Sequence, residues 1–218
     1  MNPVDIDLPA ATRWEARNSP TRRVPSHGTN LFGTALATDL VPVDARGRSA
    51  PITWRTLLAT EPAEAFVGFG LGLVAPVAGT VVRVHDGEPD RAATRSPVAH
   101  VPFALGQAGR VRAGIEAVAG NHVVLAVGEG GPFLLIAHLQ RGSTRVVEGQ
   151  RVDRGEPLGA CGNSGNSVQP HVHLQATDSL DWPAARPVAL RLRAYRRVSD
   201  GVVVASALPD EGEVIEPA

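Results

Sequence analysis

The chain has 218 residues, enough for one substantial core, and its 43% apolar and 20% charged content is ordinary for a soluble globular protein. A formal net charge of -1 gives no general attraction to polyanions, so neither a nucleic-acid partner nor an anionic membrane is expected. The single cysteine excludes an internal disulfide and a zinc site made of four cysteines. Any zinc site must therefore use histidine and carboxylate ligands.

The composition favours short strands over long helices. Glycine and proline are abundant, aromatic residues make up only 4%, and valine runs recur between turn residues. The predicted fold class is mainly β, a compact sandwich or barrel-like domain with loop insertions.

Residues 1–23 predict an irregular N-terminal arm. This arm lacks the basic start and the apolar run that a secretion signal needs, and no apolar stretch reaches the roughly 18 residues of a membrane span. The sequence therefore predicts no transmembrane segment and favours a cytoplasmic location, and extracytoplasmic action would require another route of export.

A strand is expected over residues 37–43, and it carries Asp39 among apolar neighbours. An unpaired carboxylate is costly in such a setting, so Asp39 needs a partner. The partner is either a group in a functional site, such as the preceding His27, or the Ser/Thr-rich turn beside the strand.

The middle of the chain predicts a short helix over 52–59, two short strands within 66–84, and an irregular insertion over 88–120 with a short helix near 103–112. An insertion of this length is either a functional flap or a solvated surface excursion. His85 and His100 lie at its borders and are interpreted as surface or packing residues.

Strands are expected again over 121–127 and 133–139, the second of which contains His138. His138 faces a cleft or is a hydrogen-bonded core histidine. Ser164 lacks the G-x-S-x-G context of a nucleophile, and a lone Cys161 is more typical of packing. After two further strands, over 188–197 and 202–207, the acidic tail from Pro209 is expected to fray.

The stretch from Pro170 to Gln175 reads Pro-His-Val-His-Leu-Gln. In a strand, His171 and His173 would project from one face with Cα atoms about 6.5 Å apart. Two imidazoles on one face indicate a metal site or acid/base chemistry; the alternative is a pair of half-buried histidines in an ordinary strand.

Five polar residues therefore need an explanation. A hydrolytic zinc ion takes three protein ligands from histidine and carboxylate and leaves a fourth position for water, so two histidines and one aspartate would suffice. Two spare histidines could then handle protons and stabilise an oxyanion. The five residues are His27, Asp39, His138, His171 and His173.

Together these motifs resemble the lysostaphin/LytM-type zinc metallopeptidases of peptidase family M23. The resemblance implies that His27, Asp39 and His173 bind one zinc ion per chain, with no other cofactor. It also implies that His138 and His171 are the catalytic partners. The motifs that carry it are His27 with Asp39, Ala75-Pro-Val-Ala-Gly-Thr-Val-Val82, Ala137-His138-Leu139, Val147-Glu-Gly-Gln-Arg-Val152, Gly162-Asn-Ser-Gly165 and Pro170-His-Val-His-Leu174.

The resemblance further implies a β-rich fold of the duplicated hybrid motif type with an open groove. The peptidase domain would span 24–180, with 181–218 as a β extension and acidic tail. The implied activity is that of an endopeptidase acting on stem peptides or cross-bridges of peptidoglycan. Either peptides or peptidoglycan would be the partner.

One motif departs from the family pattern, which is His-x-x-x-Asp. Here eleven residues separate His27 from Asp39, which indicates an extended loop, and Asp44 is the alternative ligand. A catalytically silent member of the family, acting as a binding or regulatory module in cell-wall turnover, is the rival interpretation, and zinc content separates the two.

The stretch from Val147 to Leu158 also looks like the hairpin of biotinyl/lipoyl carrier domains, but these carry their cofactor on a lysine, and the chain has none. Sugar-phosphotransferase carrier proteins use two facing histidines but leave His27, Asp39 and His138 unexplained.

Overall fold

The protein is described here by a computed structural model covering residues 2–218. Within these residues most regular structure is strand, which confirms the predicted mainly β class. A 12-stranded sheet runs in the order β1-β12-β14-β2-β3-β10-β7-β6-β5-β8, with β11 paired to β10 and β13 to β12. Its strands are β1 (Val4–Ile6), β2 (Arg13–Arg17), β3 (Thr38–Val43), β5 (Gly79–His85), β6 (Asn121–Ala126), β7 (Phe133–Leu139), β8 (Arg151–Val152), β10 (Val172–Thr177), β11 (Pro187–Val188), β12 (Leu190–Arg197), β13 (Val203–Ala207) and β14 (Val214–Pro217).

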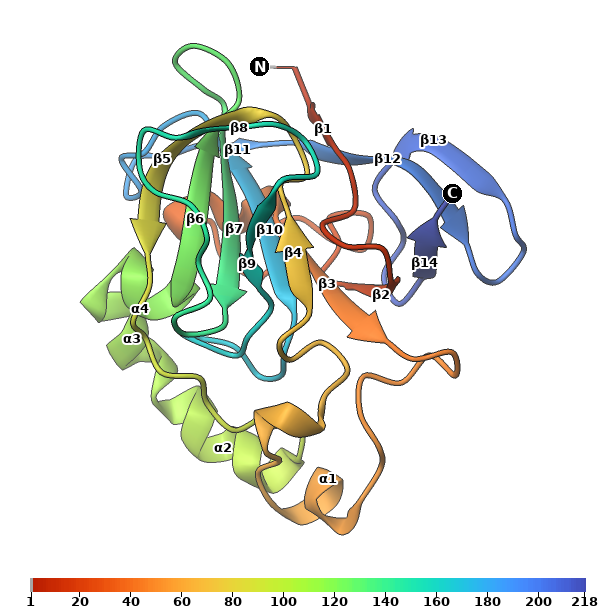
Figure 1. Ribbon diagram of the computed structural model, residues 1–218. Helices are drawn as coiled ribbons and strands as arrows, with labels where there is room; N and C mark the ends of the chain where they lie inside the picture. The colour runs from red at the N-terminus through yellow and green to blue at the C-terminus, as the bar shows by residue number, and fades with distance from the viewer. Residues whose placement is uncertain (1) are drawn as a thin grey trace.

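A second layer covers one face of the large sheet. Strands β4 (Gly72–Val74) and β9 (Pro157–Ala160) pair with each other and lie in front of it in Figure 1. Leu73 and Leu158 from this layer are fully buried with Leu134, Ile136 and Leu174 of the large sheet. The main core therefore lies between the two layers, as expected for a sandwich.

The other face of the large sheet is partly covered by helices (Figure 1). The segment expected as an irregular insertion contains three short helices, α2 (Pro97–Leu105), α3 (Gln107–Ala113) and α4 (Ile115–Ala119). The Ser96 hydroxyl accepts from the backbone N–H groups of Val98 and Ala99, which caps α2. The predicted helix over 52–59 is present as α1 (Trp54–Leu58), and two short 3-10 elements are η1 (Leu31–Leu36) and η2 (Ala63–Ala65).

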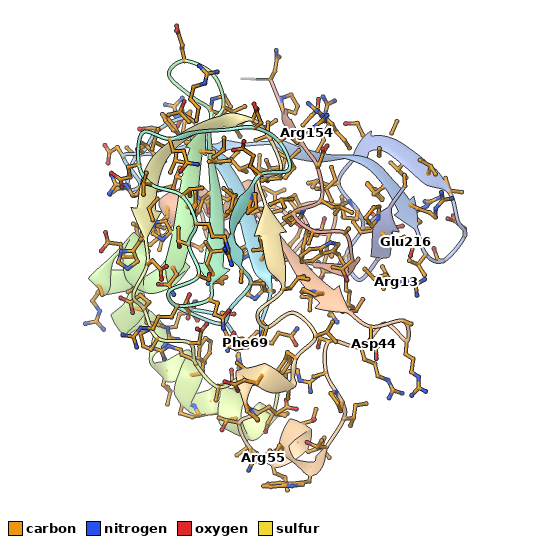
Figure 2. All side chains as sticks on the ribbon, in the orientation of Figure 1. Arg13, Asp44, Arg55, Phe69, Arg154 and Glu216 are labelled. Atoms are coloured by element: carbon orange, nitrogen blue, oxygen red, sulfur yellow. The ribbon has the colours of Figure 1, made fainter. Side chains whose placement is uncertain are left out.

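Both ends of the chain are built into the large sheet, contrary to the expected irregular arm and frayed tail. Trp14 on β2 is fully buried and is the register partner of Ile215 on β14, which is also fully buried. Arg13 and Glu216 form an ion pair of 2.8 Å beside them (Figure 2). Burial of large apolar side chains outweighs the irregular, acidic composition of these segments. Where the domain boundaries fall stays a prediction.

None of the helices in the described part of the chain has the length and apolar character needed to span a bilayer.

Candidate metal and catalytic site

The site lies on the face of the large sheet opposite the main core, and β10 is its centre. The apolar residues of β10, Val172, Leu174 and Ala176, belong to the core, whereas His173 and Gln175 line a pocket on the other face. This is the two-residue alternation of a strand. His171, just before β10, lines the same pocket, so the predicted same-face placement of the two histidines is confirmed.

Strand β3 supplies Asp39, the direct cross-strand partner of His173. The Asp39 Oδ1 atom lies 2.9 Å from His173 Nδ1, and both carboxylate oxygens lie 3.2 Å from His27 Nε2. The extended loop between His27 and Asp39 thus returns both residues to one place. Candidate ligand atoms of His27, Asp39 and His173 all lie within 4.8 Å of one another.

Two imidazoles and a carboxylate form a donor set that fits zinc, which binds both ligand types at about 2.0–2.2 Å. The Asp39 carboxylate is buried and also accepts a hydrogen bond of 2.7 Å from the Asn18 side-chain amide. Such an outer-shell partner orients a carboxylate ligand. The residues present could therefore hold one zinc ion.

A bulge in β7 brings His138 to the same pocket. Asn121 of β6 pairs with Leu139, while His122 pairs with Ala137, so His138 is the extra residue between them. Its φ of 64° lies in the left-handed region, which is uncommon for a residue other than glycine. The bulge shifts the alternation of β7, so that Leu139 enters the core and His138 lines the pocket.

The nitrogens of His138 and His171 that point away from the site are each held by a backbone carbonyl. His138 Nδ1 lies 2.9 Å from the Ser164 carbonyl oxygen, and His171 Nδ1 lies 2.7 Å from that of Gln169. A carbonyl only accepts, so each Nδ1 donates. In the neutral rings, the Nε2 lone pairs are therefore left for chemistry.

His27 is oriented in the same way, through a hydroxyl group. The Ser26 hydroxyl donates to the Thr34 carbonyl oxygen (3.1 Å) and therefore accepts from His27 Nδ1 (3.0 Å). His27 then presents its Nε2 lone pair to Asp39. His173 is arranged the other way round, because its Nε2 contacts Gln175 Oε1 at 3.1 Å and its Nδ1 faces the site.

The Gly162 to Gly165 loop positions the carbonyl that holds His138. Gly165 has a φ of 70°, and a Cβ there would collide with the backbone of Gly120. The Ser164 hydroxyl donates to the Leu139 carbonyl oxygen at 2.8 Å and is fully buried. Ser164 is thus a structural residue, in agreement with the absence of a nucleophile motif.

Charge in the site centres on Asp39. Burial opposes its ionisation, but the charges of His27 and His171 and the hydrogen bonds from His173 and His27 outweigh burial and hold the pKa of Asp39 well below its usual value. Burial disfavours a charged His27, yet Asp39 raises its pKa. Burial lowers the pKa of His138 and of His171, so both are neutral bases at neutral pH.

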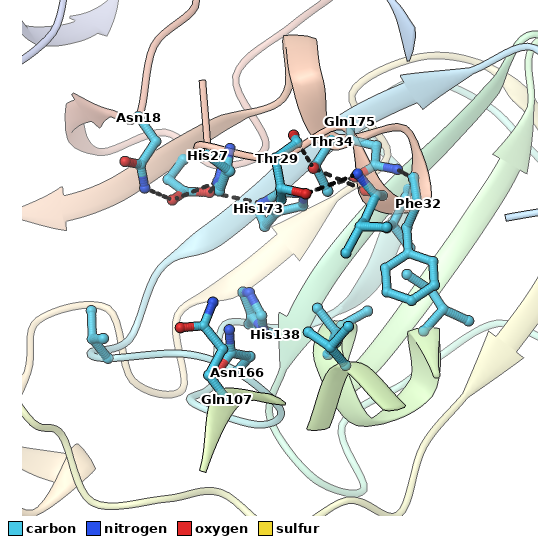
Figure 3. Close-up of a pocket in the computed structure, with 18 of the residues that line it drawn as sticks. Asn18, His27, Thr29, Phe32, Thr34, Gln107, His138, Asn166, His173 and Gln175 are labelled. Atoms are coloured by element: carbon cyan, nitrogen blue, oxygen red, sulfur yellow. Dashed lines mark hydrogen bonds and ion pairs between the residues drawn. The ribbon is translucent and has the colours of Figure 1, made fainter. Parts of the chain in front are cut away.

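The pocket has a volume of about 260 Å³ and an apolar wall opposite the histidines (Figure 3). The wall comes from helices α2 to α4, so the segment over 88–120 borders the site rather than being a surface excursion alone. Its residues are Phe103, Val111, Ile115 and Val118. Among the described residues that line the pocket, Asp39 is the only acidic one and none is an arginine.

The helical wall is tied to the loop that precedes His171. The Arg110 Nε atom donates to Asn166 Oδ1 at 2.7 Å, and the Asn166 backbone N–H donates to the Val118 carbonyl oxygen at 2.8 Å. The Arg110 guanidinium also lies over the Phe103 ring, 4.3 Å from its centre. These contacts hold the wall against the site.

The two alternative candidates lie elsewhere. Asp44, beyond the end of β3 (Figure 2), accepts hydrogen bonds from the backbone N–H groups of Arg46 (2.8 Å) and Arg48 (2.9 Å), as in a turn. Cys161 is buried in the main core, and burial raises the pKa of its thiol, which disfavours the reactive thiolate.

Sequence reasoning missed three residues that line the pocket: Asn18, His100 and Gln175. Gln175 had a signal, because it follows His173 by two residues in the same strand. Asn18 had none, since it comes from the segment expected to be irregular. His100, interpreted as a surface or packing residue, is exposed but borders the pocket.

Comparison with known proteins gives one family match. The model of peptidase family M23 matches residues 85–182, a region that contains His138, His171 and His173 but not His27 or Asp39. A comparison with curated proteins finds no match.

Similar solved structures include the catalytic domain of lysostaphin from Staphylococcus simulans, with 16% identity over 60% of this chain and 82% of that chain (TM-score 0.36). The prophage-encoded M23 protein EnpA from Enterococcus faecalis is 17% identical over 65% of this chain and 94% of that chain (TM-score 0.37). A putative glycyl-glycine endopeptidase LytM from Ruminococcus gnavus is 15% identical over 70% of this chain and 42% of that chain (TM-score 0.37).

These scores are low, so the assignment rests on the family match and on the residues that carry the motifs. The match over residues 85–182 confirms that this chain is similar to the lysostaphin/LytM-type peptidases of family M23.

Proposed function

We propose that this protein is a zinc-dependent metalloendopeptidase that hydrolyses peptide bonds in peptidoglycan stem peptides or cross-bridges. The supporting observation is that His27, Asp39 and His173 bring three ligand atoms within 4.8 Å of one another, beside two further histidines in one pocket. The family match over residues 85–182 supports the hydrolysis of peptides.

Zinc bound by these three residues would lower the pKa of a water molecule to about 7 and polarise the scissile carbonyl. Two imidazoles and one carboxylate leave a net charge near +1 for these tasks. Asn18 keeps the Asp39 carboxylate oriented, with its amide 2.7 Å from Oδ2.

His171 and His138 would move the protons. Their rings lie close together, with centroids 4.7 Å apart, and each Nδ1 is engaged with a carbonyl, so each Nε2 can accept a proton. One ring would take the proton of the attacking water, and the other, once protonated, would donate to the developing oxyanion. The two roles are interchangeable.

The lining of the pocket favours an uncharged substrate. A charged side chain beside the scissile bond would lose its hydration against Phe103, Val111 and Ile115 without gaining a counter-ion. Peptide segments with small or aliphatic side chains therefore fit best.

The test is mass spectrometry of the products from purified peptidoglycan and from Gly-rich peptides, each with and without a chelator. We expect chelator-sensitive cleavage of at least one of them, with activity restored by one zinc equivalent per chain. The His173→Ala variant is the control and should be inactive.

A catalytically silent binding module is the alternative. Absence of chelator-sensitive cleavage in both substrates, together with retained binding to peptidoglycan, would favour it. Zinc content alone separates most cases, because a silent module need not hold zinc.

A further inference from the structure

Gln175 makes two contacts that together determine its orientation. Its Nε2 atom donates to the Phe32 carbonyl oxygen at 2.5 Å, and its Oε1 atom lies 3.1 Å from His173 Nε2. Because a carbonyl only accepts, the Phe32 contact identifies which end of the amide is the NH2 group. The other end is therefore an oxygen, and His173 Nε2 must donate to it. The neutral ring then presents its Nδ1 lone pair to the site.

Phe32 belongs to the unusually long loop between His27 and Asp39. Its φ of 56° is a left-handed conformation that costs free energy in a residue other than glycine, and such strain is often found beside functional sites. The next residue, Gly33, has a φ of 75°, and a Cβ there would lie 2.6 Å from Thr177 Cγ2 and 3.6 Å from Gln175 Nε2. The loop thus rests on β10 through bare backbone at this point.

The same loop serves His27. The Thr34 carbonyl oxygen accepts from the Ser26 hydroxyl, which in turn holds His27 Nδ1. Two carbonyl groups of one loop, those of Phe32 and Thr34, therefore end the hydrogen-bond chains behind two of the three candidate ligands.

We propose that Gln175 is a positioning residue that, anchored by the Phe32 carbonyl, selects the tautomer and ring orientation in which His173 binds metal through Nδ1. The extended loop between His27 and Asp39 is then a functional part of the site, because it carries one ligand at each end and orients the third. The inference rests on the proposed zinc site, but it does not depend on peptidase activity.

The first experiment measures zinc affinity by competition with a chelator. Gln175→Met keeps the length of the side chain but removes the amide, whereas Gly33→Ala leaves the amide intact and displaces the loop that holds it. Each change should weaken zinc binding about 10- to 100-fold, the effect of losing an outer-shell partner. Gln150→Met, the same change in the turn before β8, should leave the affinity unchanged.

Coupling between the two variants tests the chain of contacts itself. If Gly33 acts through Gln175, the double variant should bind zinc no more weakly than the weaker single variant, because residues that act as one unit are not additive. Losses that simply multiply would overturn the proposal.

The second experiment reads the tautomer of His173 by 15N–1H NMR of the histidine rings, in zinc-free and in zinc-loaded protein. We expect the proton on Nε2 in the wild type and a mixture of tautomers in zinc-free Gln175→Met. An unchanged tautomer and unchanged zinc affinity in a folded Gln175→Met would overturn the proposal.

Gln175→Asn, whose amide is one methylene too short to reach both partners, replaces Gln175→Met if that variant does not fold. A protein that fails to cleave any peptide but shows these changes in zinc affinity and tautomer contradicts the proposed function and leaves this inference standing.

Discussion

The large sheet carries two groups of buried histidines on neighbouring strands, and they differ in what surrounds them. In one group, His27, His138, His171 and His173 gather beside Asp39 and an open pocket. In the other, His85 and His122 are cross-strand partners on β5 and β6, with stacked rings whose centroids lie 5.5 Å apart.

The second pair lacks the features that make a site. His122 is fully buried, and within residues 2–218 its Nε2 atom has no hydrogen-bond partner. Burial, with a smaller contribution from His85, lowers the pKa of His122 to about 4 although the Gly120 carbonyl opposes this, so the ring is neutral at pH 7. Burial alone makes an imidazole a packing residue; a shared carboxylate and an open pocket make the first group a candidate for chemistry.

The largest expected effect comes from removing the shared carboxylate. Asp39→Asn should abolish turnover and weaken zinc binding by more than the about 10- to 100-fold typical of an outer-shell partner, because it removes a ligand charge. Equilibrium dialysis with metal analysis measures the affinity. Asp44→Asn is the matched control, and a loss of zinc there instead would assign the ligand to the turn.

Removing a histidine that does not bind zinc should affect turnover alone. His171→Ala and His138→Ala should each lower kcat about 10²- to 10⁴-fold with zinc content unchanged, because each ring handles a proton in the reaction. Steady-state kinetics on a peptide substrate measures kcat. His85→Ala, from the other group, should keep wild-type turnover, and equal losses in all three variants would contradict the contrast between the groups.

The packing role of His122 predicts an acid sensitivity with a defined sign. Its pKa in the folded protein, about 4, lies below the unfolded value near 6.5, so its neutral form contributes stability above pH 6.5 that is lost as the pH falls toward 4. The contribution is on the order of 3 kcal/mol. Urea unfolding of zinc-free protein at pH 7.5 and 4.5 measures it. In His122→Phe the free energy of unfolding should fall less between these two pH values, and an equal fall in both proteins would show that His122 does not titrate in this way.

The smallest expected effect concerns the apolar wall, which only the first group faces. Val111→Glu should lower kcat/KM about tenfold for peptides with an aliphatic side chain at the cleaved bond, because the pocket loses apolar contact and gains an unpaired charge. Val101→Glu, on the exposed side of α2, is the matched control. Peptides that differ in one side chain supply the measurement, and a wild-type preference for acidic side chains would refute an apolar subsite.

Local periodicity made parts of the site predictable. The alternation over residues 170–175 placed His171 and His173 on one face because the side chains of a strand alternate regardless of its neighbours. The cost of burying an unpaired carboxylate likewise predicted that Asp39 has a partner. Composition excluded a four-cysteine zinc site and a lysine-linked cofactor, because the chain contains one cysteine and no lysine.

Other parts depended on contacts between distant segments. The bulge that turns His138 toward the pocket arises from the register between β6 and β7, and an apolar run with one histidine does not encode it locally. Asn18 reaches Asp39 only because β2 pairs with β3, and the helical wall faces the histidines only after the chain has folded back.

By itself, the sequence determined the chemistry available to this protein: histidine and carboxylate donors, no lysine, a single cysteine, and a strand with two imidazoles on one face. The tertiary structure decided which donors meet, and which nitrogen of each ring faces the site. The physical reason is that the hydrogen-bond partners of those rings, such as the Phe32 carbonyl behind Gln175, come from segments that only the folded sheet brings together.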